Sequence, residues 1–259
     1  MTTTLTPSRP SNPSAAVPIR PLRFPTLTAV ELRKMTDTRS GRWLLATIVG
    51  LVGAVLVYKM TQTKVDIAFD NYSLAATNVV AFLAPIIGLL AMTSEWTQRT
   101  ALTTFTLAPR RLPVFAAKYV VAVGLSLAVL AVCLLMAAGA TGLAGLVHDG
   151  ASFTGSFDAV RSAVIIVVLQ VTMAAAFGAL AAQSVVALVA YLAAPTAWAI
   201  ASDALFGEAA PWFDIFGAYD QLSSSQPFDH LAQTLTSITL WVIIPSVIGI
   251  TRSLRREVK

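Results

Sequence analysis

Six long apolar segments constrain the fold of this 259-residue chain more than any other feature of its sequence. A helix needs about 20 mostly apolar residues to cross the roughly 30 Å hydrocarbon core of a bilayer. Charged residues make up only 12% of the chain, about half of the usual share in a soluble domain. The sequence therefore predicts an all-α integral membrane protein whose transmembrane domain covers 43–250, with six spans at about 43–60, 74–93, 113–140, 160–182, 185–201 and 235–250.

The fourth and fifth spans are predicted from one continuous apolar segment. Residues 160–200 number 41, and Arg161 is the only charged one among them. A straight helix of this length would extend roughly 60 Å, about twice the thickness of the hydrocarbon core. The chain must therefore turn back within the segment, and the adjacent Gln183 and Ser184 are its most polar point.

The basic residues predict how the spans are oriented. Of the 18 Lys and Arg residues, 15 precede the first span, lie near the connection of the second and third spans, or follow the sixth. Such residues collect in cytoplasmic loops next to spans, so we expect both termini in the cytoplasm and a basic tail at 251–259. This distribution also explains the net charge of +5, and we expect no nucleic-acid partner.

The chain before the first span divides into two parts. Residues 1–25 hold six of the thirteen prolines and are predicted to be a disordered cytoplasmic tail. Residues 26–42 are predicted to form an amphipathic helix in the membrane interface. The alternative is a basic flank that only sets the orientation. The basic residues expected at the interface are Arg33, Lys34, Arg39, Arg42, Arg110, Arg111 and Lys118, the last of which can extend to it from the first turns of the third span.

The connection between the second and third spans is predicted to contain a cytoplasmic helix at 94–108. Ser94 can cap its N-terminus, and Pro109 can end it. Glu95 in the first turn would complement the helix dipole. The alternative is a solvated loop that only turns the chain around.

The sequence offers little for catalysis. It lacks the GxxxxGK phosphate-binding loop as well as HExxH and GxSxG, and with one cysteine and two histidines we expect no metal site and no enzyme. Three polar residues inside spans, Asn78, Gln170 and Thr172, either form interhelical hydrogen bonds or line a substrate path. The small residues Ala174, Gly178 and Ala182 are spaced for close packing against another helix, of this chain or of a second copy.

These features together resemble the permeases of ABC-2 type transporters. The resemblance extends over the whole chain in topology, including the basic helix with the sequence Glu31-Leu32-Arg33-Lys34. Its specific motif lies between the second and third spans, where Arg99 stands in place of the family's usual glycine. The matching positions are Glu95, Thr100, Leu102 to Leu107, Pro109, Arg110 or Arg111, and Lys118.

The resemblance implies a type V exporter-like architecture. The alanine-rich composition and the lack of a signal peptide predict a bacterial plasma (inner) membrane. Such a permease pairs with a second copy or a homologous permease and docks two separate ATP-binding-cassette subunits, which bind the ATP and magnesium. This chain would then bind no cofactor itself. The 94–108 helix would be the coupling helix, in which Glu95, Gln98, Arg99 and Thr100 would face the ATPase or hold the helix to the interfacial helix. The few charges deep in the spans favour export of an amphipathic or hydrophobic substrate.

Two other functions remain open from the sequence. The chain could be a membrane anchor or sensor subunit with no transport path. It could also be a self-sufficient secondary carrier, although such carriers commonly need carboxylates at mid-depth in their spans, and these spans have none.

Overall fold

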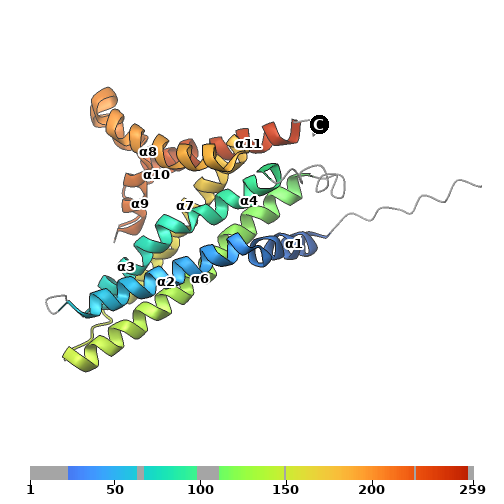
Figure 1. Cartoon of the computed structure of the whole chain (residues 1–259). Coiled ribbons are helices and arrows are strands. Elements are labelled where there is room, and N and C mark those ends of the chain that lie inside the picture. The colour runs from blue at the N-terminus through green and yellow to red at the C-terminus, as the bar shows by residue number, and fades with distance from the viewer. Residues whose placement is uncertain (1–22, 63–66, 98–110, 149, 225, 256–259) are drawn as a thin grey trace, which may run out of the picture.

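The computed structural model describes residues 23–62, 67–97, 111–148, 150–224 and 226–255, and these contain no β-strand (Figure 1). Helices form almost all of this part of the chain. Their bounds are α1 Phe24–Asp37, α2 Arg39–Met60, α3 Phe69–Leu83, α4 Pro85–Thr97, α6 Arg111–His148, α7 Ser156–Ala181, α8 Ser184–Phe206, η1 Gly207–Trp212, α9 Ile215–Ser223, α10 Leu231–Ile238, η2 Thr239–Ile243 and α11 Ile244–Arg255.

Among the described residues, six helical segments are long and apolar enough to cross a membrane, which confirms the predicted number. They are Arg39–Met60, Phe69–Thr97, Arg111–Val147, Ser156–Ala181, Ser184–Ser202 and Leu231–Arg255. The chain thus has the helices of a multi-pass membrane protein. The third extends further than predicted, because residues 141–147 continue its apolar sequence. At about 1.5 Å per residue, the 38 residues of α6 reach roughly 57 Å, so this helix must tilt in a bilayer or project from it.

Breaks in the helices have local causes. α3 gives way to α4 at Pro85, which has no N–H to donate to the preceding turn. The chain leaves α7 at Ala182, in the left-handed conformation with φ 54°, and α8 begins at Ser184. The predicted turn at Gln183 and Ser184 is therefore confirmed.

The helix predicted to lie in the interface ends earlier than expected. α1 stops at Asp37, and Thr38 is extended with ψ 143°. The Thr38 Oγ1 accepts a hydrogen bond of 3.2 Å from the N–H of Gly41 and so caps the N-terminus of α2. The predicted range 26–42 is wrong at its C-terminal end, because residues 39–42 belong to the first spanning helix.

α7 lies at the centre of the helix packing. It contacts α4, α6, α8 and α11, and Figure 1 shows it between the group of α8, α10 and α11 and the group of α2, α3 and α6. In contrast, only 17% of the first span and 11% of the fifth are buried, against 56% of the fourth. α2 and α8 therefore present most of their apolar surface to the surroundings of the molecule.

Close packing between α4 and α7 depends on two glycines. A Cβ placed on Gly178 would lie 3.0 Å from the carbonyl oxygen of Leu89, and one on Gly88 would overlap the carbonyl oxygen of Val171. Ala174 is fully buried. Gly178 of the fourth span thus packs against another helix of the same chain, whereas Ala182 lies just beyond α7 as its left-handed C-cap.

We expect Gly88→Ala to lower the free energy of unfolding by about 1–3 kcal/mol, because the added methyl group must push α4 away from the backbone of α7. The measurement is thermal unfolding of the purified protein in detergent. Gly124→Ala is the matched control, because a Cβ at this position on α6 meets nothing within 4 Å. Equal unfolding midpoints for the two variants would contradict the packing described above.

Candidate functional site

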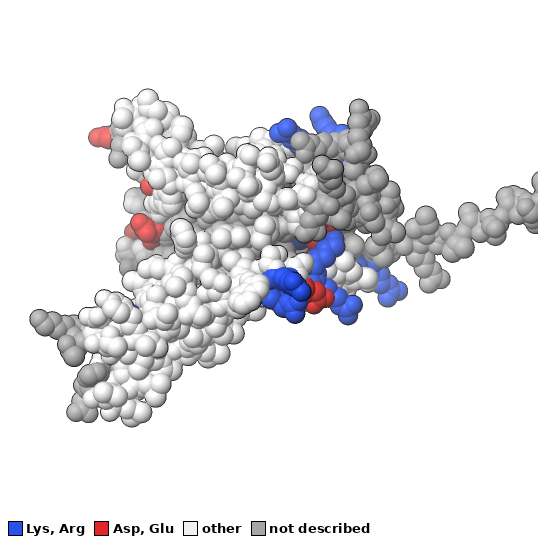
Figure 2. Space-filling view, in the orientation of Figure 1, with Lys and Arg blue, Asp and Glu red and all other residues white. Residues whose placement is uncertain are grey.

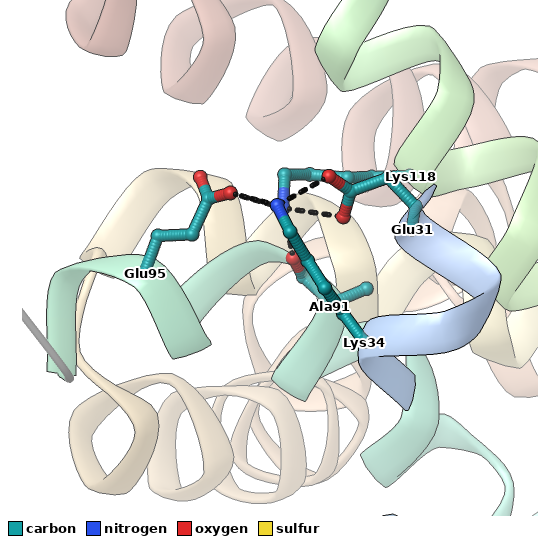
Figure 3. A network of polar contacts seen from close by, with 5 residues as sticks. All are labelled: Glu31, Lys34, Ala91, Glu95 and Lys118. Carbon is teal, nitrogen blue, oxygen red and sulfur yellow. Dashed lines mark hydrogen bonds and ion pairs between the residues drawn. The ribbon is translucent and has the colours of Figure 1, made fainter. Parts of the chain in front are cut away.

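Four charged side chains from three helices meet at one end of the molecule (Figure 3): Glu31 and Lys34 of α1, Glu95 of α4, and Lys118 of α6. Lys34 Nζ lies 2.7 Å from a Glu31 oxygen and 2.8 Å from Glu95 Oε1. Lys118 Nζ lies 2.9 Å from the other Glu31 oxygen and 3.3 Å from Glu95 Oε1. It also donates a 3.0 Å hydrogen bond to the carbonyl oxygen of Ala91. We call these four residues the charge cluster.

The charge cluster is largely shielded from solvent. Glu31, Glu95 and Lys118 are 4%, 5% and 2% exposed to solvent, whereas the Lys34 side chain is 40% exposed. Buried charges are tolerated when they are paired and hydrogen-bonded. Two cations and two carboxylates make the cluster formally neutral, so each buried charge has a partner of opposite sign.

Apolar contacts hold α1 in place beside the cluster. Leu27 lies one turn before Glu31 on the same face of α1 and packs with Val114 and Ala117 of α6. Ala117 is the residue before Lys118, so the apolar contact and the ion pairs adjoin. This face of α1 is therefore fixed against α6 by both kinds of interaction.

The Lys34 ammonium group stays charged in this setting. Burial by itself lowers the pKa of Lys34, but the hydrogen bonds to Glu31 and Glu95 and the attraction of both carboxylates raise it above the usual 10.5. Because the pKa of Lys34 is higher in the folded protein, its charge contributes fully to stability at any pH below the usual 10.5. That contribution is lost only when the pH rises through the raised pKa. Lys34 therefore bridges the two carboxylates throughout the neutral range.

Of the residues predicted to couple the chain to an ATPase, the structure describes Glu95. Gln98, Arg99 and Thr100 lie outside the described residues. Glu95 contacts Lys34 on α1, which agrees with its predicted alternative role of holding the connection to the interfacial helix. The prediction that Ser94 caps the N-terminus of a separate helix is wrong, because α4 continues through Ser94 to Thr97. The buried ion pairs of Glu95 keep that turn of α4 within the packed bundle.

The predicted interfacial basic residues differ in their surroundings. Lys118 does not extend to the interface, because the carboxylates of Glu31 and Glu95 pair with it inside the protein. Arg111 donates hydrogen bonds of 3.1 and 3.3 Å to the carbonyl oxygens of Ser253 and Leu254, joining the start of α6 to the end of α11. Arg110 lies outside the described residues, whereas Arg33, Lys34, Arg39 and Arg42 are classed as exposed.

Basic side chains gather at one end of the molecule. Figure 2 shows most of the visible Lys and Arg side chains at the end that carries α1 and the end of α11, with a few acidic side chains among them and others toward the opposite end. The charge cluster lies at the basic end, and so do the two helix ends, Thr97 and Arg111, that flank residues 98–110. The first and last described residues thus lie at the same end of the bundle (Figure 1).

The structure does not bring the predicted path residues together. Asn78 is exposed on α3. Gln170 accepts a 3.5 Å hydrogen bond from the hydroxyl of Tyr191, and the Thr172 hydroxyl donates to the Val168 carbonyl in its own helix. The Gln170 bond to Tyr191 of α8 agrees with the alternative of interhelical hydrogen bonding, whereas the Thr172 bond stays within α7. A path lined by the three residues stays a prediction.

Sequence reasoning missed Glu31 as a functional residue. Two signals pointed to it. Glu31 is an acidic residue within a basic segment, and it lies three residues before Lys34 and four after Leu27, on one helix face. In addition, a lysine inside a span calls for a carboxylate partner, and Lys118 had none nearby in the sequence.

Comparison with known proteins adds no relative. No protein-family model matches the chain, and neither the curated proteins nor the solved structures contain a significant match. The resemblance to ABC-2 permeases therefore rests on the residues and topology given above.

Proposed function

We propose that this chain is the membrane-spanning permease subunit of an ABC-2 type transporter, driven by separate ATP-binding-cassette subunits. The observation that carries the proposal is the charge cluster, which joins α1 to the end of α4 and the start of α6. α4 and α6 are the helices that flank residues 98–110, where the ATPase would dock. Force applied there would enter three helices at once.

The chemistry of the cluster suits a mechanical link. Separating one partner from a buried ion pair leaves an uncompensated charge, which typically destabilises a protein by about 3–5 kcal/mol. α1, α4 and α6 are therefore expected to move together rather than slide past one another. Rigid-body movement of a helix group is a common way to convert a local push into a change of a whole domain.

Other features agree with the remaining parts of the proposal. Among the described spans, the one formed by α8 has the smallest buried share, and it offers surface for a second permease copy or a homologous permease. The basic end of the molecule would face the cytoplasm of a bacterium by the positive-inside rule. The substrate would be amphipathic or hydrophobic and would be exported, while ATP and magnesium would bind to the partner subunits.

Co-purification tests the proposal. We expect the tagged chain, extracted from its native cells in mild detergent, to bring with it an ATP-binding-cassette protein in about equal amounts. Mass spectrometry identifies the partner, and ATP hydrolysis by the complex confirms that it is active. Recovery of the chain without any ATPase would contradict the proposal and favour the anchor or sensor function.

A further inference from the structure

A hollow lies at the start of α2, just after the break at Thr38. It has a volume of about 360 Å³, and its described lining residues are Arg39, Arg42, Trp43 and Ala46. Their spacing of three, four and seven residues from Arg39 places all four on one face of the helix. We call this hollow the elbow site, because it lies where α1 meets α2.

The elbow site carries positive charge that no acidic side chain among the described residues pairs with. Within the described ranges, neither Arg39 nor Arg42 forms an ion pair. Arg42 donates one 3.3 Å hydrogen bond to the carbonyl oxygen of Asp37, which leaves most of its donors available. Two guanidinium groups one turn apart match the oxygens of a phosphate, which arginine binds in a forked geometry.

An exposed apolar surface continues from the elbow site along α2. Trp43 is 72% exposed, and further along the helix Leu51, Val57 and Tyr58 are 46%, 63% and 65% exposed. α2 is long and apolar enough to cross a bilayer, so this surface would run along the hydrocarbon. Trp43, at the beginning of the span, occupies the level at which tryptophan prefers the membrane interface.

We propose that the elbow site binds an anionic phospholipid, with its headgroup phosphate on Arg39 and Arg42 and its acyl chains along α2. A soluble anion would use the two arginines and gain nothing from the exposed apolar face beyond them. A second copy paired symmetrically through this surface would bring the arginines of both copies together, which like charges oppose. The proposal is independent of the transporter function, because it needs only the spanning helix and its basic start.

Native mass spectrometry of the delipidated full-length protein tests the proposal with three probes: short-chain phosphatidylglycerol, short-chain phosphatidylcholine and glycerol 3-phosphate. We expect phosphatidylglycerol to bind about tenfold more tightly than phosphatidylcholine, because only the former carries a net negative charge to meet the arginines. Similar affinities for the two lipids would overturn the proposal. Glycerol 3-phosphate binding as tightly as phosphatidylglycerol would show a soluble-anion site instead and would also overturn it.

Two double variants of equal charge locate the binding. Arg39→Gln with Arg42→Gln is expected to abolish the preference for phosphatidylglycerol. Arg33→Gln with Arg252→Gln removes two exposed arginines at the same end of the molecule and is expected to keep the preference within about twofold. Equal losses in both double variants would show unspecific attraction to a basic surface and contradict the elbow site.

The folding of the variants is checked by their thermal unfolding midpoints. If the double variant is unstable, Arg39→Gln alone replaces it in the binding measurement. This change is tolerated because the Arg39 side chain is exposed and makes no ion pair within the described residues. We expect this single variant to lose part of the preference for phosphatidylglycerol. An unchanged preference in a folded Arg39→Gln protein would overturn the assignment of the phosphate to Arg39.

Discussion

Lys118→Met is expected to lower the free energy of unfolding by about 3–5 kcal/mol, because it removes one partner from a buried set of charges. Glu31 and Glu95 are 4% and 5% exposed, and of the cations that the structure describes beside them, the partly exposed Lys34 would remain after the change. The carbonyl oxygen of Ala91 would also lose its bond to the lysine. Unfolding of the purified protein in detergent, followed by its change in helicity, measures the effect.

A second substitution distinguishes lost charge balance from the lost hydrogen bonds of the lysine. Lys118→Met combined with Glu31→Gln restores a neutral cluster of Lys34 and Glu95, which lie 2.8 Å apart. We expect this double variant to recover at least half of the lost stability. If Lys118→Met alone unfolds like the unchanged protein, the cluster does not hold the three helices together. If the double variant is no better than Lys118→Met, loss of the hydrogen bonds made by the Lys118 ammonium group, and not loss of charge balance, explains the lower stability.

The spans could be predicted from the sequence because their requirement is local. About 20 apolar residues are needed whatever the rest of the chain does, and the long segment at 160–200 had to turn back for reasons of length alone. The small residue Gly178 also indicated close packing. That its partner is α4 follows only from the arrangement of the helices.

Which residues pair in the charge cluster could not be predicted, although Glu31 and Lys118 each gave a signal, because the paired residues are distant in the sequence. Lys118 pairs with Glu31, 87 residues away, and Lys34 with Glu95, 61 residues away. A lysine near the end of a span usually extends to the interface, and nothing next to Lys118 in the sequence argues otherwise. The packing of α1 against α6 brings a carboxylate to it and makes burial the better state.

The positions at which helices begin could not be fully predicted from the sequence either. Thr38 and Ser94 are both good N-cap residues by type, yet only Thr38 caps a helix. At Thr38 the chain turns from α1 into α2. At Ser94 the helix continues because the next residue, Glu95, points to Lys34 and Lys118. Tertiary contacts thus decide between two positions that local propensity treats alike.

If the chain is the permease proposed above, Arg99→Glu reduces recovery of the ATPase with the tagged chain by about tenfold, because a reversed charge at a docking surface opposes the partner that the original charge attracted. Arg99 belongs to the predicted coupling segment, four residues after the buried Glu95. Quantitative mass spectrometry of the co-purified proteins measures the ratio. Arg252→Glu, at an exposed position near the end of α11, makes the same change of charge and is expected to leave the ratio within about twofold.

Glu95→Gln distinguishes docking of the ATPase from transmission of its movement to the spanning helices. This variant leaves residues 98–110 unchanged but removes the carboxylate that joins α4 to Lys34 and Lys118. If residues 98–110 dock the ATPase and the charge cluster transmits its movement, Glu95→Gln keeps the ATPase bound while substrate no longer stimulates ATP hydrolysis. Normal stimulation in Glu95→Gln would contradict a role of the cluster in transmission. An unchanged ratio in Arg99→Glu would instead place the docking surface outside the predicted segment, so the two variants test the two halves of the mechanism independently.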